Sequence, residues 1–359
     1  MNFNFYLLKS LRIVLFPFSL IYGLIVIARN FLFDRKIIRS TNFNLPVICV
    51  GNLSVGGTGK SPTVEYLIKS LITYYRVATL SRGYKRKTKG YALAGVNTTA
   101  LEIGDEPMQF HSKFPGVAVA VGEERIVAIP QLLHDRPDTQ VIILDDAFQH
   151  RAIRAGLNIL LTEYNNLFTR DFFLPTGDLR DQRSSYKRAH IIIVSKCPSE
   201  LSAIEREKVM KEIDPLPHQR VFFTCIKYGT PYHIISKNKI NLNLDYEVLL
   251  VCGIANPVPL KAYLGEHTKA YDQMLFTDHH IFTIDDLRKI TDQFNEIEAK
   301  EKVILTTEKD AVRLVKFQLE LQEVPLYVLP ITINFLFDEA RHFDAAVLSF
   351  INEFKLKNK

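Results

Sequence analysis

Residues 51–61 read GNLSVGGTGKS and follow directly on the apolar run VICV at 47–50. Apolar residues then recur every three or four positions from Val64 to Tyr75, which predicts an amphipathic helix. A strand, a glycine-rich turn and a helix in this order are the context in which a GxxxxGK[ST] sequence binds phosphate. We therefore expect a phosphate-binding loop in an α/β protein.

The loop departs from the usual pattern at its start, because Ser54 stands where the first glycine is expected. The remaining glycines let backbone N–H groups turn towards phosphate oxygens at a helix N-terminus. We predict that Lys60 reaches the β- and γ-phosphates of ATP and that the Ser61 hydroxyl binds Mg²⁺. A glycine-rich turn without a ligand is the alternative. The predicted ATP-binding residues of the loop are Ser54, Val55, Gly56, Gly57, Thr58, Gly59, Lys60 and Ser61.

Strand-like runs and helical patterns alternate along the chain, which predicts a P-loop NTPase-like parallel sheet with helices on both faces. Such runs are found at 77–80, 117–121, 141–144, 157–161, 190–194 and 221–225. A second set, with strands at 248–251, 303–306 and 326–329 and helices at 283–294 and 338–354, predicts a smaller α/β lobe. We divide the chain into an N-terminal membrane-associating helix (1–30), a P-loop kinase core (31–225) and a C-terminal lobe with its linker (226–359).

Two carboxylates, Asp145 and Asp146, end the apolar run at 141–144. A phosphate loop needs an acidic group at the end of a neighbouring strand to hold Mg²⁺ or its water ligands. The pair is therefore predicted to bind Mg²⁺ together with Ser61. Gln149 and His150 follow, and they either order this site or form a surface turn.

Three further polar segments each leave two interpretations open. Asp105 in the sequence GDEP is either a helix N-cap or a carboxylate that takes a proton from an attacking hydroxyl. The Asp278-His279-His280 segment can supply metal ligands or a proton relay. The basic segment at 81–89 is either a solvated loop or a contact for phosphate and anionic headgroups.

Sixteen residues without a charge lie between Arg12 and Arg29. As a helix they span roughly 24 Å, less than the roughly 30 Å hydrocarbon core of a bilayer. Basic residues flank them, as expected for a helix that lies on an anionic membrane. We predict peripheral or monotopic attachment at the cytoplasmic face of the inner membrane. A buried core helix is the alternative, and a signal peptide is disfavoured because no small-residue cleavage site follows.

The net charge of +6 is compatible with an anionic membrane surface or with nucleic acid. Zinc-type Cys/His spacing and aromatic RNA-binding motifs are absent from the sequence, so we expect no nucleic-acid partner. The four cysteines are widely spaced and three lie in apolar runs, which indicates reduced, buried thiols.

The sequence resembles the tetraacyldisaccharide 4′-kinase family, the lipid A 4′-kinases, through most of its length. The resemblance includes Ser54 within the loop. Its motifs, in chain order, are GNLSVGGTGKSP from Gly51, SRGY from Ser81, GDEP from Gly104, GEER from Gly122, DDAFQH from Asp145, LPTGDLRD from Leu174, GIANP from Gly253, FTDHHIFT from Phe276 and TTEKDAVRL from Thr306.

The resemblance implies transfer of the γ-phosphate of ATP to the 4′-hydroxyl of a tetraacylated glucosamine disaccharide 1-phosphate, which makes lipid IVA in lipid A biosynthesis. It implies two α/β/α lobes joined by a short β-linker. It also implies a role for each matched residue: Asp105 as the base, His279 as its assistant, Arg125 as a contact for phosphate or substrate, and Lys60, Ser61, Asp145 and Asp146 as the ATP and Mg²⁺ site.

Two positions depart from the family pattern: Ala147 where DDGFQH is common, and Asp181 where LRE is commoner. The role of Asp181 is left open. A GTPase is one alternative function, but residues 195–198 read SKCP and lack the aspartate of the guanine-reading NKxD motif. A membrane-tethered nucleotide-binding module is the non-enzymatic alternative, and it would have no need of Asp105 or His279.

Overall fold

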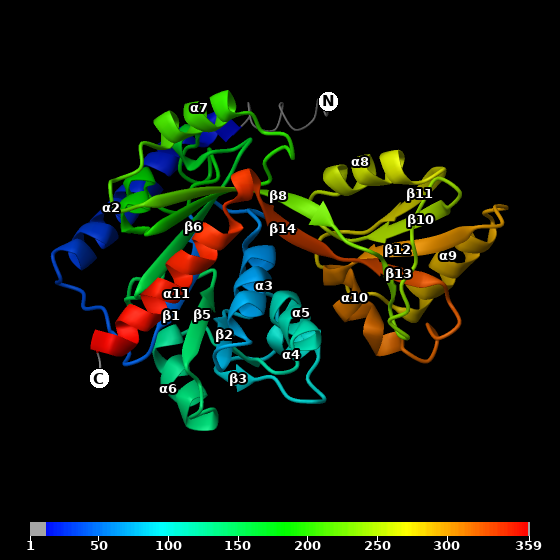
Figure 1. Ribbon diagram of the computed structural model, residues 1–359, viewed down its shortest axis with the longest axis horizontal. Helices are drawn as coiled ribbons and strands as arrows, with labels where there is room; N and C mark the ends of the chain where they lie inside the picture. The colour runs from blue at the N-terminus through cyan, green and yellow to red at the C-terminus, as the bar shows by residue number, and fades with distance from the viewer. Residues whose placement is uncertain (1–11, 358–359) are drawn as a thin grey trace.

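The structure is a computed structural model that describes residues 12–357 in two α/β lobes lying side by side (Figure 1). Within these residues the large lobe has a nine-stranded sheet in the order β14-β8-β7-β6-β1-β5-β2-β4-β3. The central strands pair in parallel, whereas β3 and β14 are antiparallel edge strands. The strands are β1 Val47–Asn52, β2 Val77–Ser81, β3 Ala92–Leu93, β4 Ala118–Val121, β5 Val141–Asp145, β6 Leu157–Glu163, β7 Ile191–Ser195, β8 Arg220–Tyr228 and β14 Ile331–Phe335.

Helices cover both faces of this sheet, so the predicted fold class is confirmed. Alternate residues of a strand point to opposite faces. Accordingly, Val47 and Cys49 of β1 join one core cluster with α6 and α7, while Ile48 and Val50 join another with α3, α5 and α11. The helices are α3 Lys60–Leu71, α4 Ala100–Ile103, α5 Asp105–Lys113, α6 Arg125–Asp135, α7 Ala203–Ile213 and α11 Ala340–Lys357, with short 3₁₀ helices η2 Phe168–Arg170, η3 Arg183–Arg188 and η5 Leu336–Asp338.

The small lobe has a five-stranded sheet in the order β11-β10-β12-β13-β9, parallel except for β9. One face packs against α9 and α10 and the other against α8, around Leu249 and Leu250 of the central strand. Its elements are β9 Tyr232–His233, β10 Glu247–Cys252, α8 Val258–His267, β11 Ala270–Leu275, α9 Ile284–Asn295, β12 Lys302–Thr307, α10 Glu308–Leu314, η4 Val315–Phe317 and β13 Leu326–Leu329.

The predicted lobe boundaries need a correction at the C-terminal end. We expected the small lobe to run from 226 to 359, but β14 pairs with β8 in the large sheet. α11 then buries Phe343, Val347 and Ile351 in the large lobe's core. The small lobe is therefore an insertion between two strands of the large sheet. The chain crosses between the lobes twice, and the crossings are joined by a 2.8 Å hydrogen bond from Gly229 N to Pro330 O.

The N-terminal helix lies along the outer side of the large lobe (Figure 1). It comprises η1 Ile13–Leu15 and α2 Phe16–Asp34, and residues 1–11 of the predicted segment lie outside the described residues. Ser19, Gly23, Val26 and Asn30 form its buried face. Most of its other apolar side chains are exposed, while Tyr22, Leu32 and Phe33 are half-buried, so the alternative of a buried core helix is wrong. The exposed residues are Ile13, Val14, Leu15, Phe16, Phe18, Leu20, Ile21, Leu24, Ile25, Ile27 and Phe31.

Candidate active site

The predicted phosphate loop lies at the carboxyl end of β1, where the chain turns into α3. Gly56 and Gly59 have φ angles of 103° and 84°, which residues with a Cβ rarely adopt. A Cβ added at Gly56 or Gly57 would meet nothing within 4 Å, so the backbone there is accessible to a ligand. α3 begins at Lys60, and its N-terminus adds a partial positive charge beside the loop. This geometry is suited to binding phosphate.

Side chains from neighbouring strands hold the loop in place. Asn52 Nδ2 donates to Thr58 Oγ1 over 2.9 Å, and Ser195 Oγ, at the end of β7, donates to Thr58 O over 2.8 Å. The backbone N of Val55 donates to Asp178 O over 2.7 Å. A pocket lies beside the loop, and the predicted residues 54–58 form part of its lining. Its full lining is Ser54, Val55, Gly56, Gly57, Thr58, Leu161, Thr162, Glu163, Asn166 and Asp178.

One member of the predicted acidic pair, Asp146, lies near the loop lysine. β5 lies beside β1, with Val50 paired to Asp145, so the carboxylates follow the strand next to the loop. Lys60 Nζ lies 3.8 Å from Asp146 Oδ1. Arg180 contacts the same carboxylate with both terminal nitrogens, and its Nη1 is 3.1 Å from Asp146 Oδ2.

The two carboxylates have opposite electrostatic environments. Burial raises the pKa of Asp145 to about 7, and the neighbouring Asp146 adds to this rise. Burial acts in the same direction on Asp146, but Lys60 and Arg180 outweigh it and lower the pKa of that carboxyl. Asp146 is therefore the more acidic member of the pair.

The chemistry of the pair fits Mg²⁺. Asp145 Oδ1 is buried and has no hydrogen-bond partner among the described residues. Within residues 12–357, no three His, Cys, Asp or Glu side chains gather closely enough to form a complete metal site. Mg²⁺ commonly needs only one or two carboxylates plus the phosphates of its substrate. Asp145, Asp146 and Ser61, in the first turn of α3, are the residues that would hold it.

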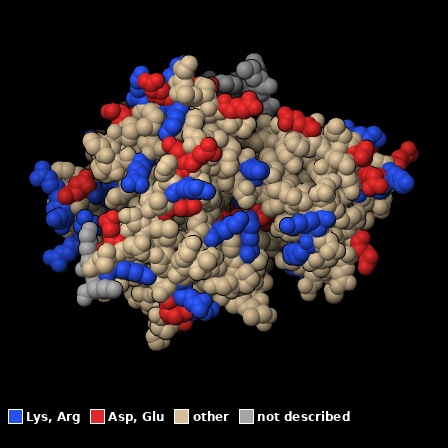
Figure 2. Space-filling view, viewed as in Figure 1, with Lys and Arg blue, Asp and Glu red and all other residues tan. Residues whose placement is uncertain are grey.

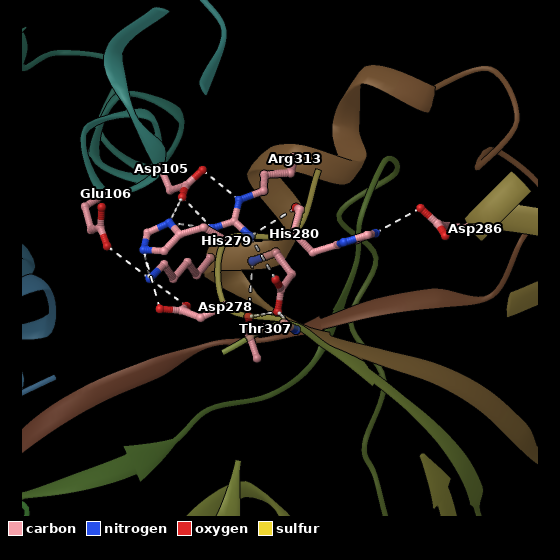
Figure 3. Close-up of polar contacts among 11 residues, drawn as sticks. Asp105, Glu106, Asp278, His279, His280, Asp286, Thr307 and Arg313 are labelled. Atoms are coloured by element: carbon pink, nitrogen blue, oxygen red, sulfur yellow. Dashed lines mark hydrogen bonds and ion pairs between the residues drawn. The ribbon is translucent and has the colours of Figure 1, made fainter. Parts of the chain in front are cut away.

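Asp105 and His279 meet at the junction of the lobes, although they are 174 positions apart in the sequence (Figure 3). Asp105 is the first residue of α5, and His279 follows β11 in the small lobe. His279 Nδ1 lies 2.5 Å from Asp105 Oδ2. Arg313 of α10 donates to both oxygens of Asp105, with Nε 2.7 Å from Oδ1. The carboxylate is thus shared between an imidazole and a guanidinium.

These contacts exclude one of the two interpretations of Asp105, and the role of a base stays a prediction. The N-cap position of α5 is Gly104, and the Asp105 side chain is bonded to the small lobe, so the N-cap interpretation is wrong. Burial acts to raise the pKa of Asp105, but hydrogen bonds from His279 and Arg313 outweigh it and lower the pKa to about 2. Asp105 is therefore a carboxylate anion throughout the neutral range.

Lys309 and Glu106 connect the two halves of the site. Lys309 Nζ lies 3.2 Å from His279 Nε2, 3.2 Å from Glu106 Oε1 and 3.4 Å from Asp278 Oδ1. The charge of Glu106 acts on the titration of both Lys60 and Asp145. The phosphate loop and the Asp105 region are therefore neighbours. Acidic and basic side chains are both visible where the lobes meet (Figure 2).

The roles of Lys309 and Arg313 were not predicted, although both lie in the quoted TTEKDAVRL motif. A signal was present: they stand four positions apart directly after a strand, which places them on one face of a helix. Thr307 caps that helix by accepting a hydrogen bond from Asp310 N over 3.1 Å. What the sequence lacked was any sign that this face is turned to Asp105.

The two histidines of the Asp278-His279-His280 segment contact different carboxylates. His280 Nε2 lies 2.9 Å from Asp286 Oδ2, while His279 points to Asp105. These contacts favour a relay over metal ligation. The basic segment at 81–89 reaches the same region through Tyr84, whose ring lies 5.8 Å from that of His279.

Arg125 is almost fully buried, with 1% of its surface exposed. Its Nη1 donates to Glu123 O over 3.1 Å, and its Nε and Nη2 have no partner among the described residues. Burial lowers its pKa to about 10, opposed by Asp145 and Asp146. The charges of the acidic pair therefore act on the guanidinium, and its contact with phosphate or substrate stays a prediction.

The residues whose roles were left open have structural partners. Gln149 Nε2 donates to Asn52 O over 2.5 Å and so braces the end of β1. His150 is largely buried, and burial together with Arg125 lowers its pKa to about 4. Asp181 is buried and accepts hydrogen bonds from Asn30 of α2 over 2.7 Å and from Arg188 over 2.8 Å. Its carboxylate therefore ties the N-terminal helix to the large lobe.

A glycine-rich loop at the end of β1 and a carboxylate pair at the end of β5 define a P-loop nucleotide-binding protein, here with a second lobe beside the phosphate site. The chain belongs to the tetraacyldisaccharide-1-P 4′-kinase family (LpxK), which matches residues 11–352.

Named relatives and a solved structure agree with this family. The chain is 46% identical to the tetraacyldisaccharide 4′-kinase of Flavobacterium johnsoniae, over 96% of this chain and 99% of that one. It is 43% identical to that of Bacteroides thetaiotaomicron, over 94% and 93%. The fold is similar to the crystal structure of LpxK from Aquifex aeolicus in complex with ATP, with a TM-score of 0.74, 26% identity and coverage of 95% and 99%.

Proposed function

We propose that this protein transfers the γ-phosphate of ATP to the 4′-hydroxyl of a tetraacyldisaccharide 1-phosphate, the reaction named for its relatives. The observation that carries the proposal is the meeting of two half-sites. A phosphate loop with an acidic pair lies in the large lobe, and a buried Asp105–His279 pair spans the junction of the lobes beside it. A nucleotide-binding module would need only the first half-site.

The phosphate loop supplies the donor half of the reaction. Backbone N–H groups of the glycine loop would surround the phosphates, and Lys60 would neutralise the charge that develops on the transferred group. Asp145, Asp146 and Ser61 would hold Mg²⁺, which when bound neutralises the β- and γ-phosphate oxygens. Arg180 keeps Asp146 directed towards Lys60 before the metal arrives.

Asp105 is the proposed contact for the 4′-hydroxyl, which accepts the phosphate. A carboxylate has about four lone-pair sites, so Asp105 can accept a hydrogen bond from the 4′-hydroxyl while Arg313 and His279 keep theirs. A pKa of about 2 makes it a weak base. A weak base suffices in a loose phosphoryl transfer, because the hydroxyl loses its proton late and needs orientation first. His279 holds the Asp105 carboxylate in place, and its imidazole is a second possible acceptor for the proton of the 4′-hydroxyl.

The lipid substrate enters from the membrane, in this proposal, along α2. The exposed apolar face of α2 suits acyl chains and the membrane interface, and exposed basic residues lie in its second half, at Arg29, and after its end, at Arg35, Lys36 and Arg39. The 22-residue helix Ile13–Asp34 is apolar enough to cross a bilayer by length and composition alone. However, Tyr22 and Asn30 hydrogen-bond to Arg180 O and Asp181. This favours a helix that lies at the interface of the cytoplasmic leaflet, where ATP is available.

A direct assay tests the proposal. Purified protein is incubated with γ-labelled ATP, Mg²⁺ and tetraacyldisaccharide 1-phosphate, and the lipid products are separated by chromatography. We expect a labelled bisphosphorylated lipid. Tight ATP binding with no labelled lipid would support the nucleotide-binding module instead, and a preference for GTP over ATP would support a GTPase.

A further inference from the structure

A group of charges, which we call the Lys113 cluster, lies between the lobes outside the residues assigned to catalysis, with buried carboxylates and a half-buried lysine. It consists of Glu65, Lys113 and Glu308. Lys113 Nζ lies 2.6 Å from Glu65 Oε2 and 2.6 Å from Glu308 Oε1. Glu65 and Glu308 are 5% and 6% exposed. Gln109 Nε2 completes the cluster by donating to Glu65 Oε1 over 2.7 Å.

The cluster joins the three helices that carry the two half-sites. Glu65 is on α3, which begins at Lys60, and Lys113 is on α5, which begins at Asp105. Glu308 is the first residue of α10, the helix that presents Lys309 and Arg313 to His279 and Asp105. The ammonium of Lys113 therefore links one element of the small lobe to two elements of the large lobe.

The cluster also lies where the chain crosses between the lobes. Ile331, the first residue of β14, donates its backbone N–H to Glu308 Oε2 over 3.1 Å. The preceding residue, Pro330, accepts the hydrogen bond from Gly229 of the other crossing. A change of angle between the lobes at these crossings must move Glu308 relative to Lys113.

The charges of the cluster make such movement costly. One cation stands between two buried carboxylates, and burial raises the pKa of Glu65 to about 7. Breaking a buried ion pair by removing one partner leaves an uncompensated charge, which is strongly destabilising. Rotation of the lobes that separates Lys113 from Glu308 would likewise leave a buried charge uncompensated. The cluster thus favours one relative position of α5 and α10.

We propose that Lys113 is a positioning residue, which sets the angle between the lobes and thereby places the Asp105–His279 pair against the phosphate loop. The inference rests on the proposed roles of Lys60, Asp105 and His279. Its effect is indirect, because the partners of Lys113 are Glu65 of α3 and Glu308 of α10, which are not among the residues proposed to bind the nucleotide or the acceptor. A displacement of about 1 Å between reacting groups costs on the order of 10²-fold in rate, so a small change of angle is enough.

Kinetics of Lys113→Met in the full-length protein give the first test. We expect kcat to fall about 10²-fold while the KM for ATP stays within about twofold of wild type, because the loop itself is untouched. Lys113→Arg should recover most of the loss. Lys269→Met is the matched control, since Lys269 forms a 2.7 Å ion pair with Glu247 inside the small lobe. Equal kcat values for Lys113→Met and Lys269→Met would overturn the proposal.

A distance measurement gives the second test and needs no turnover. Spin labels are attached to cysteines introduced at Val96 of the large lobe and Leu319 of the small lobe, which are 99% and 75% exposed, while the four native cysteines are buried. Double electron–electron resonance should show a broader or shifted distribution of the distance between the two labels in Lys113→Met. In Lys269→Met the distribution should be unchanged. An unchanged distribution in Lys113→Met would overturn the proposal, whatever the kcat.

A third variant covers the case in which Lys113→Met does not fold. Lys113→Met with Glu65→Gln and Glu308→Gln removes all three charges and keeps their shape. It should fold, because no buried charge is left unpaired, and should still show the lower kcat and the broader distances. A triple variant with wild-type distances would overturn the positioning role. Failure of the kinase assignment itself would appear differently, as absence of lipid product in the wild-type protein.

Discussion

Asp105 of the large lobe and Arg313 of the small lobe form a two-point ion pair, with Arg313 Nε 2.7 Å from Asp105 Oδ1. Both residues are buried, at 7% exposure each. The pair therefore fixes a carboxylate of one lobe by a guanidinium of the other, and it controls the charge state of the proposed base. Planar guanidinium and carboxylate groups match in geometry, so lysine could not replace Arg313 without loss.

Replacing Arg313 should make activity sensitive to acid. Burial raises the pKa of Asp105, and Arg313 is one of the two groups that lower it to about 2. In Arg313→Met the pKa rises, so Asp105 becomes protonated, and activity is lost, at a higher pH than in wild type. The pH profile of kcat/KM measures this shift of the acid limb. Arg288→Met, which breaks an exposed ion pair with Asp285, is the control and should leave the profile unchanged.

Asp105→Asn should lower kcat by about 10²–10⁴-fold with the KM for ATP near wild type. Asparagine keeps the size of the side chain but accepts no proton at neutral pH. His279→Ala should lower kcat less, and the double variant should lose less than the product of the two effects, because the pair acts as one unit. Steady-state kinetics of the four proteins test this. Near-normal turnover in Asp105→Asn would place the base elsewhere, with Asp145 and Asp146 as the next candidates.

Lys60→Ala should reduce the rate of transfer on the order of 10²–10³-fold. The lysine lies 3.8 Å from Asp146 and follows directly on the glycine loop, so its charge is placed for the β- and γ-phosphates. Single-turnover transfer at saturating ATP is the measurement. Activity within a few-fold of wild type would rule out the phosphate-loop assignment.

The exposed face of α2 should be needed for membrane binding. Leu24→Ser and Ile25→Ser change side chains that are 67% and 62% exposed and leave the docked face, with Asn30, intact. Each should weaken binding to anionic vesicles by about 10-fold, from the lost burial of apolar surface, with the KM for ATP unchanged. Leu319→Ser, at an exposed apolar position of the small lobe, is the control. Undiminished vesicle sedimentation of both α2 variants would mean that this face does not contact the membrane.

The donor half of the site was predictable from the sequence because its parts are local. The run from β1 through the loop to Lys60 is continuous, and the apolar strand before Asp145 and Asp146 carries an obvious pattern. Parallel strands place their carboxyl ends at one edge of a sheet, which brings these segments together without further information.

The acceptor half and the lobe boundaries were harder to predict because they depend on long-range contacts. Asp105 and Arg313 lie 208 positions apart, and no local pattern links them. The β11 sequence, AYDQML, is polar enough to escape recognition as a strand, since it is a mostly exposed edge strand. β14 was not among the predicted strands, and its pairing with β8 is a long-range contact that assigns it to the large sheet.

The site of phosphorylation tests the central claim most directly. After transfer from γ-labelled ATP, the lipid product is treated with mild acid, which cleaves a phosphate on the anomeric 1-position and spares a phosphate monoester on a ring hydroxyl. The label should stay on the lipid, and mass spectrometry should place it on the 4′-oxygen of the distal glucosamine. Loss of the label with the 1-phosphate, or label released only as inorganic phosphate, would contradict the assignment of this protein as a 4′-kinase.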